Sequence, residues 1–150
     1  MAYRLSKRSL KNLEGVDSRL VEVVNIAIKL STVDFAVIEG LRTIERQKQL
    51  VAAGASQTLK SKHIKGEAVD LMAFIGSRGS WELNLYDEIA DAMREGAIQV
   101  GIPIRWGAAW TVSDIRKWKG TMESAMNRYI DVRRSEGKRP FIDAPHFEIV

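Results

Sequence analysis

The two histidines of this chain are its only ones, and each stands near an aspartate in the sequence. His63 comes before Asp70, and Asp143 comes shortly before His146. Imidazole nitrogen and carboxylate oxygen are ordinary zinc ligands, and three protein ligands plus one water make the catalytic type of zinc site. His63, Asp70 and His146 would supply the three ligands, and Asp143 would remain close by to handle protons.

Asp70 is an unusual member of the apolar run Ala-Val-Asp-Leu-Met-Ala-Phe, because a buried carboxylate without a partner is costly. Alternation along a strand would place Ala68 and Asp70 on the same face, and a cation on that face would explain the carboxylate. Gly66 would let the chain bend so that His63 folds back toward Asp70. In the second segment, Pro145 stiffens the approach to the histidine.

A zinc ion at such a site would lower the pKa of its bound water toward about 7, and a carboxylate within hydrogen-bond reach could carry the proton to a leaving amine. The same residues also have simpler interpretations. An arbitrary histidine is more often a surface or core residue than a ligand, and an aspartate near a strand often caps a turn. The helical zinc-protease signature H-E-x-x-H is absent from the sequence. Spacing alone leaves both interpretations open.

The composition of the chain limits which kinds of functional site and partner it can have. A length of 150 residues suffices for one domain with its own core, and 45% hydrophobic with 28% charged residues is typical of a soluble globule. Because cysteine is absent, disulfides, thiolate nucleophiles and cysteine-rich zinc sites are excluded, and any metal must be held by nitrogen and oxygen. The net charge of +4 could favour nucleic acid, membrane surfaces or anionic cell wall, but it is too small and dispersed to decide.

The sequence contains no apolar run of the roughly 18–20 residues that a membrane helix needs. Its basic N-terminus is not followed by the apolar segment of a signal peptide. We therefore expect synthesis in the cytoplasm without membrane insertion, so that action elsewhere would require another route of release.

The elements that would position these residues are helices and short strands, mixed without a regular βαβ rhythm. This mixture predicts a single α+β domain with a small antiparallel sheet flanked by helices. Capping residues and apolar periodicity predict helices over residues 18–30 (capped by Asp17), 44–53 (capped by Thr43), 85–100 (capped by Asn84) and 120–136. Strands are predicted over residues 34–39, 68–75, 102–106 and 146–150, and a polar loop over residues 55–65.

Two motifs resemble those of the LAS-type zinc peptidases: S-x-H-x-x-G-x-A-x-D over residues 61–70 and D-x-x-H-F-E over residues 143–148. This family includes D-Ala-D-Ala dipeptidases and carboxypeptidases and the phage L-alanyl-D-glutamate endopeptidases. Residues 38–47 resemble its G-x-R-[ST]-x-x-x-Q segment, and residues 104–107 resemble the beginning of its R-W-G-G segment. The opening of the chain, residues 5–16, is more similar to phage endolysins than to the bacterial resistance enzymes.

The resemblance implies a mononuclear zinc site, with one Zn²⁺ per chain held by His63, Asp70 and His146. It implies that Asp143 acts as the general base. It also implies that Arg42 stabilises the developing oxyanion or anchors a substrate carboxylate, which suits a fixed guanidinium. A surface salt bridge is the simpler alternative for Arg42.

Three further residues are implied as substrate contacts, each with an alternative. Ser61 could hydrogen-bond substrate or orient the neighbouring histidine, or it could only cap the loop. Gln47 could support the site from behind or be a solvated helix residue. Trp106, like Trp110 and Trp118, could line a substrate groove or pack in the core.

The sequence departs from the family pattern at one point. Where the family has W-G-G-D-W, this chain has Trp106-Gly107-Ala108-Ala109-Trp110, so the second glycine and the aspartate are replaced by alanine. Residues 111–142 also form a longer segment than expected for an endolysin. Its basic run at residues 133–139 could contact an anionic partner, although a solvated helix end explains it as well.

The resemblance predicts a phage endolysin that hydrolyses the L-Ala–D-Glu bond of peptidoglycan stem peptides. We expect one catalytic domain over residues 1–150, no separate wall-binding domain and a monomer. It would be made in the host cytoplasm and reach the wall after a partner permeabilises the membrane. The alternatives are a D-Ala-D-Ala dipeptidase or carboxypeptidase and a non-catalytic basic binding module. No recognised nucleic-acid motif is present, so no nucleic-acid partner is expected.

Overall fold

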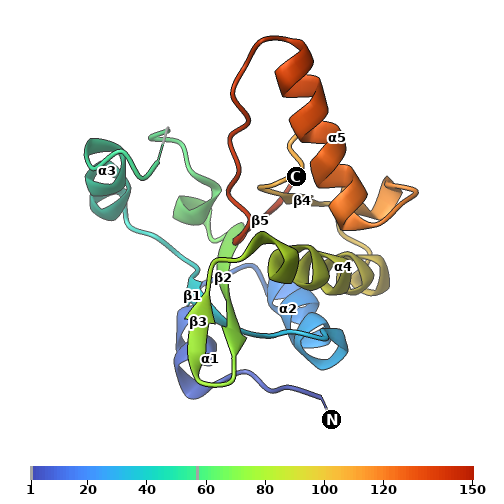
Figure 1. The fold of residues 1–150 in the computed structure, drawn as a ribbon. Coiled ribbons are helices and arrows are strands. Elements are labelled where there is room, and N and C mark those ends of the chain that lie inside the picture. The colour runs from blue at the N-terminus through green and yellow to red at the C-terminus, as the bar shows by residue number, and fades with distance from the viewer. Residues whose placement is uncertain (1, 57) are drawn as a thin grey trace.

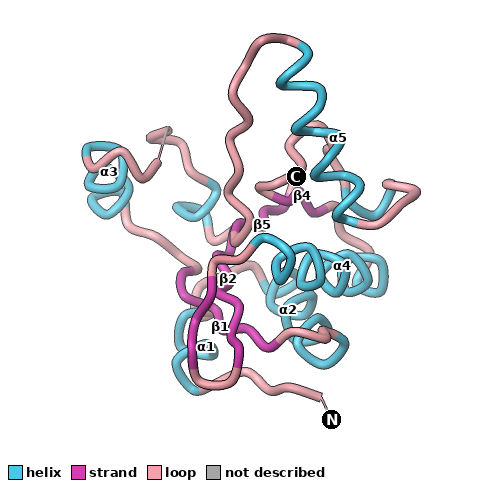
Figure 2. Tube along the Cα trace, viewed as in Figure 1, coloured by secondary structure: helices cyan, strands magenta, loops and turns pink. Residues whose placement is uncertain are grey.

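The structure is a computed structural model that describes residues 2–56 and 58–150. Figures 1 and 2 show its helices and strands. Within these residues the helices are α1 (Lys7–Asn12), α2 (Ser18–Leu30), α3 (Ile44–Ala52), η1 (Lys62–Lys65), α4 (Leu83–Val100), η2 (Ile115–Lys117) and α5 (Met122–Ser135), where η marks 3-10 helix. The strands are β1 (Asp34–Glu39), β2 (Ala68–Ile75), β3 (Arg78–Ser80), β4 (Ile104–Trp106) and β5 (His146–Ile149).

The strands form one antiparallel sheet in the order β1-β2-β5-β4, with β3 paired to the C-terminal part of β2. The last strand, β5, lies between β2 and β4, so the end of the chain runs beside a strand from its middle (Figure 1). The predicted α+β fold with a small antiparallel sheet is therefore confirmed.

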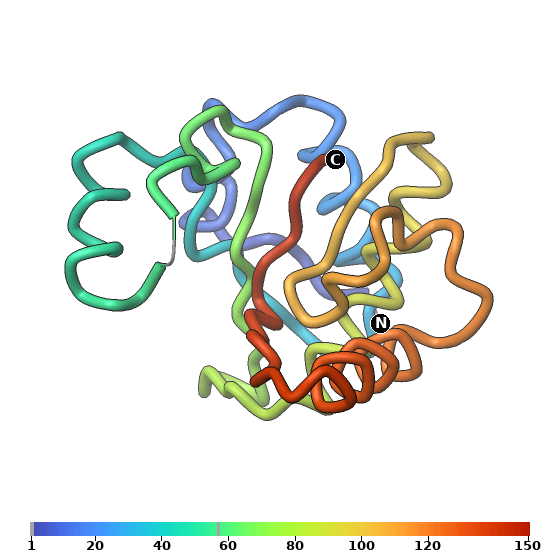
Figure 3. The backbone as a smooth tube through the Cα atoms, turned by 90° about the horizontal axis from the view of Figure 1, so that it is seen from above, coloured from blue at the N-terminus to red at the C-terminus, as the bar shows by residue number. Residues whose placement is uncertain are grey.

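The core forms largely where α2 and α4 pack against each other along the sheet (Figure 1). A side-chain carbon added at Gly96 of α4 would lie 2.8 Å from the backbone oxygen of Val23 in α2, so glycine permits this close approach. In contrast, α3 and α5 project away from each other in both Figure 1 and the view from above in Figure 3.

Several predicted elements appear as expected. The helix over residues 18–30 and the strands over residues 34–39 and 68–75 have their predicted bounds. Asp17 caps α2 by accepting a hydrogen bond from the Arg19 amide, and Thr43 caps α3 by accepting one from the Arg46 amide. Local capping chemistry and apolar periodicity therefore suffice for these elements.

Other boundaries differ from the prediction. Asn84 does not cap α4, which begins at Leu83 after Glu82 and has no side-chain cap. The last helix begins at Met122 after the cap Thr121, two residues later than predicted. The region predicted as a loop over residues 55–65 contains the 3-10 turn η1. The strand predicted over residues 102–106 begins at Ile104.

Three short elements were not predicted from the sequence: α1, β3 and η2. The strand β3 has the sequence Arg-Gly-Ser, which carries no strand signal of its own and is ordered by pairing with β2. Among the described residues, no helix combines the length and the apolar character needed to cross a lipid bilayer.

Candidate metal centre and active site

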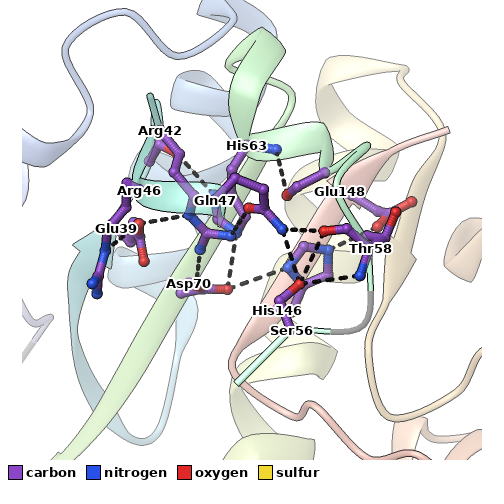
Figure 4. A network of polar contacts seen from close by, with 12 residues as sticks. Glu39, Arg42, Arg46, Gln47, Ser56, Thr58, His63, Asp70, His146 and Glu148 are labelled. Carbon is purple, nitrogen blue, oxygen red and sulfur yellow. Dashed lines mark hydrogen bonds and ion pairs between the residues drawn. The ribbon is translucent and has the colours of Figure 1, made fainter. Parts of the chain in front are cut away.

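Three segments bring the predicted ligands together. Asp70 in β2 and His146 in β5 are direct partners in the antiparallel register, although they are 76 residues apart in sequence. The turn η1 presents His63 to the same place, and the three residues form a group whose potential ligand atoms all lie within 4.8 Å of one another (Figure 4). The sheet therefore joins the two motifs that the sequence keeps apart.

Backbone contacts fix the position of η1. Ser61 caps the turn by accepting a hydrogen bond from the His63 amide, and Gly66 ends it in the left-handed conformation at φ +68°. A side-chain carbon at Gly66 would also lie 2.4 Å from the Gly15 oxygen. The predicted bend at Gly66 is thus present, and no other residue fits it without strain.

The hydrogen bonds of His63 leave one ring nitrogen available to a metal. Its Nδ1 lies 2.8 Å from the backbone oxygen of Gly40, and a carbonyl can only accept, so Nδ1 carries the proton. Its Nε2 is buried and, among the described residues, has no hydrogen-bond partner, although Asp70 Oδ1 is 3.2 Å away. A buried nitrogen lone pair without a donor is costly in a protein but is what a metal ligand requires.

His146 is oriented by an equivalent contact. Its Nε2 lies 2.7 Å from Glu148 Oε1, while its Nδ1 faces Asp70 Oδ1 at 3.2 Å (Figure 4). Burial disfavours the charged ring, but the bonds to Asp70 and Glu148 outweigh it and raise the pKa of His146 to about 9. Because Glu148 holds a proton on Nε2, a cation that displaces the Nδ1 proton would bind at Nδ1.

Asp70 links the two imidazoles to Arg42. Its Oδ1 lies 3.2 Å from both His63 Nε2 and His146 Nδ1, and its Oδ2 lies 3.3 Å from Arg42 Nη2. Burial opposes ionisation of this carboxyl, but its hydrogen bond with His146 and the close His63 ring hold its pKa well below its usual range. The centre therefore contains a carboxylate already in its metal-binding form.

Asp143 lies in the same cavity as the three clustered residues. Burial, reinforced by the nearby charge of Asp70, raises the pKa of its carboxyl. Its backbone is held by two hydrogen bonds: its amide donates to Gly107, and its carbonyl accepts from the His146 amide. A side-chain carbon at Gly107 would lie 2.3 Å from the backbone oxygen of Asp143, so only glycine allows the two segments to approach this closely.

The group forms one wall of a cavity of about 640 Å³. Apolar residues that line the cavity include Leu50, Trp110 and Phe141. The ring centroids of Trp110 and His146 are 5.9 Å apart. Charged side chains include Lys60 and Lys62. The cavity is large enough for several residues of a peptide and offers both polar and apolar contacts.

Arg42 lies at the cavity but is largely committed to protein contacts. Its side chain is 7% exposed and donates to Glu39 at 2.7 Å, to Gln47 at 2.7 Å and to Asp70 at 3.3 Å (Figure 4). The alternative of a surface salt bridge does not describe this buried guanidinium. It is fixed in place beside the candidate metal ligands.

Two of the predicted substrate contacts lie behind the cavity. Gln47 is fully buried, accepts from Arg42 and donates to Ser56 and Thr58, so it supports the site and is not a solvated helix residue. Trp106 is also fully buried, donates to the Ala144 oxygen and stacks on Phe147. Neither side chain is among those that line the cavity.

Ser61 does line the cavity, and its cap on η1 agrees with the loop-capping interpretation. Contact with substrate stays a prediction for this residue. Ala108 and Ala109, which replace the family glycine and aspartate, are both fully buried in the core. The replaced positions therefore do not face the cavity in this chain.

Glu39 and Glu148 contact the site although their positions in the sequence were not assigned a role. Glu148 is two residues beyond His146 on a strand, so the period of two alone would have placed both side chains on one face. Glu39, which accepts from Arg42, lies where the register of β1 and β2 is irregular, and it carried no comparable signal.

Two imidazole nitrogens and one carboxylate, held by hydrogen bonds behind them, are a donor set that suits Zn²⁺ with one open position. Together with the cavity, the general-base candidate Asp143 and the fixed Arg42, they define a metallopeptidase-type centre.

The chain belongs to the phage L-alanyl-D-glutamate peptidase family, whose model matches residues 1–150. It is 33% identical over 117 residues to the L-alanyl-D-glutamate peptidase of Escherichia phage T5, covering 75% of this chain and 85% of that protein. Its fold is similar to the crystal structure of the Serratia marcescens L-Ala D-Glu endopeptidase ChiX, with a TM-score of 0.71 and 36% identity. That match covers 98% of this chain and 90% of ChiX.

Proposed function

We propose that this protein is a phage endolysin, a zinc-dependent endopeptidase that hydrolyses the L-Ala–D-Glu bond of peptidoglycan stem peptides. The observation that carries the proposal is the convergence of one imidazole nitrogen from each histidine and the Asp70 carboxylate at a cavity. Membership of the family and the names of its two relatives support the choice of bond.

His63 Nε2, Asp70 Oδ1 and His146 Nδ1 would hold one zinc ion per chain. The bound ion supplies Lewis acidity, which polarises the scissile carbonyl and makes water a nucleophile near neutral pH. The protein's own contribution is to present the three ligand atoms already oriented, through Gly40, Glu148 and Arg42.

Asp143 acts as the proton carrier. As water adds to the carbonyl carbon, the Asp143 carboxylate takes its proton and then delivers it to the amine nitrogen as the C–N bond breaks. Burial, with the nearby charge of Asp70, raises the pKa of this carboxyl, which makes it a better proton acceptor. The products are an L-Ala carboxylate and a D-Glu amine.

Arg42 stabilises the negative charge that develops on the carbonyl oxygen. Each terminal guanidinium nitrogen carries two N–H groups, and the bonds to Gln47 and Asp70 use one on each. The remaining donors are held in a fixed, poorly solvated position, where such a contact is most effective. Ser61, whose hydroxyl accepts from the His63 amide, offers its own O–H to substrate.

Residues 1–150 are proposed to act as one monomeric catalytic domain on the cell wall. Synthesis in the host cytoplasm and passage through a permeabilised membrane complete the endolysin proposal. The +4 net charge is compatible with an anionic wall.

Mass spectrometry of digested peptidoglycan tests this proposal. The expected products are glycan strands whose stem peptides are shortened to a single L-Ala with a free carboxylate, and released peptides that begin with a D-Glu amine. Release of D-Ala or its dipeptide would instead identify a dipeptidase or carboxypeptidase. Unchanged lysis of permeabilised cells by a folded His63→Ala variant would indicate a non-catalytic binding module.

A further inference from the structure

Two lysines line the cavity on the segment that leads into His63. Lys60 and Lys62 flank Ser61, and both residues line the cavity. Within residues 2–56 and 58–150, neither ammonium group has a carboxylate within the 4.0 Å limit of an ion pair. Their positive charges are thus not neutralised by a direct protein partner.

Arg42, which also lines the cavity, differs in this respect. Its guanidinium is paired with Glu39 at 2.7 Å and with Asp70 at 3.3 Å, and its side chain is only 7% exposed. These two carboxylates offset its charge. Apart from the proposed zinc ion, the two lysines are therefore the positive groups to which an anionic part of a substrate in this cavity would be attracted.

The backbone that carries the lysines is fixed relative to the candidate metal centre. The Lys60 amide donates to Thr58 Oγ1 at 3.0 Å, and the Lys62 oxygen accepts from the Glu67 amide at 3.0 Å. Lys62 directly precedes His63 in η1. The long side chains are flexible, but they start from points held beside the reacting centre.

The proposed substrate has an anionic group close to the scissile bond. A D-glutamyl residue has two carboxyl groups, and chain extension uses only one of them. The other stays free on the same residue as the amine that leaves. We propose that Lys60 and Lys62 form a subsite for this free carboxylate on the leaving-group side of the scissile bond, an assignment that rests on the proposed function.

The subsite is tested with two matched peptides that contain the acyl-L-Ala–D-Glu bond. One has the free D-Glu carboxylate, and the other has the isosteric carboxamide. The zinc-loaded protein should cleave the carboxylate peptide with a kcat/KM about tenfold higher, because charged hydrogen bonds are the stronger ones. Lys60→Gln and Lys62→Gln should each reduce this preference through KM, and the double variant should abolish it.

Lys65→Gln is the matched control. Lys65 belongs to the same short helix, but it is exposed and is not part of the cavity wall. This variant should keep the wild-type preference, and the charge-retaining Lys62→Arg should keep most of it. Zinc content and circular dichroism of each variant separate a lost contact from a lost fold.

The outcomes distinguish the subsite from the proposed function. If the wild type cleaves both peptides equally, or if the double glutamine variant keeps the full preference, the lysine subsite is wrong while the endopeptidase function stands. An equal loss on both peptides also contradicts it. If the zinc-loaded wild type cleaves neither peptide at this bond, the proposed function fails and the subsite fails with it.

Discussion

Glu148→Ala should weaken zinc binding although Glu148 is not a proposed ligand. Its Oε1 lies 2.7 Å from His146 Nε2 and so determines which ring nitrogen carries the proton. Without this acceptor, nothing holds the proton on Nε2 when Nδ1 binds the metal, and the ring is free to rotate away from Asp70. Loss of such a partner behind a ligand typically costs 10–100-fold in metal affinity.

This loss can be measured as both affinity and stability. If the dissociation constant for zinc rises 10–100-fold, the free energy by which excess zinc stabilises the folded protein falls by about 1.4–2.7 kcal/mol. Chelator competition gives the affinity, and thermal unfolding with and without zinc gives the stabilisation. Glu22→Ala, at an exposed position of α2, is the control and should match the wild type. A folded Glu148→Ala protein with wild-type zinc affinity would refute the reasoning.

Three other variants test separate parts of the structure. Asp143→Asn should lower kcat by about 10²–10⁴-fold, the usual contribution of a general base, with zinc content unchanged; a variant with near wild-type kcat would remove Asp143 from the mechanism. Gly107→Ala should reduce activity and stability, because the new carbon would lie 2.3 Å from the backbone oxygen of Asp143. Thermal unfolding and peptide cleavage like those of the wild type would contradict this. Burial, with the nearby charge of Glu123, raises the pKa of Asp87 to about 6. The protonated Asp87 carboxyl is therefore fully tolerated below its unfolded pKa of about 4, and the protein loses stability as the pH rises through 6 and this buried group ionises. Asp87→Asn should stabilise the protein by about 1–3 kcal/mol at pH 7.5 and have little effect at pH 4. Denaturant titrations at these two pH values measure the difference.

Elements with a local signal were predictable from the sequence. The helix α2 follows from the cap Asp17 and its apolar side, and β2 follows from its apolar run. Elements that depend on distant partners were not predictable. The strand β3 exists because it pairs with β2, and α4 begins at Leu83 without a side-chain cap, so Asn84 was a misleading signal.

The candidate site shows the same division. The motifs identified His63, Asp70 and His146, and the structure brings them together through the register of β2 and β5. The sequence did not indicate which side chains face the cavity. Gln47 and Trp106 are both buried outside the cavity. Gln47 accepts a hydrogen bond from Arg42, and Trp106 packs in the core and donates to the Ala144 oxygen.

A zinc titration of the metal-free protein, followed by cleavage of an acyl-L-Ala–D-Glu peptide, tests the central claim most directly. Activity should rise linearly and reach its plateau at one zinc per chain, with no recovery in the His146→Ala variant. Full cleavage by the metal-free protein in excess chelator, or a plateau without cleavage of this bond, would contradict the proposed zinc endopeptidase.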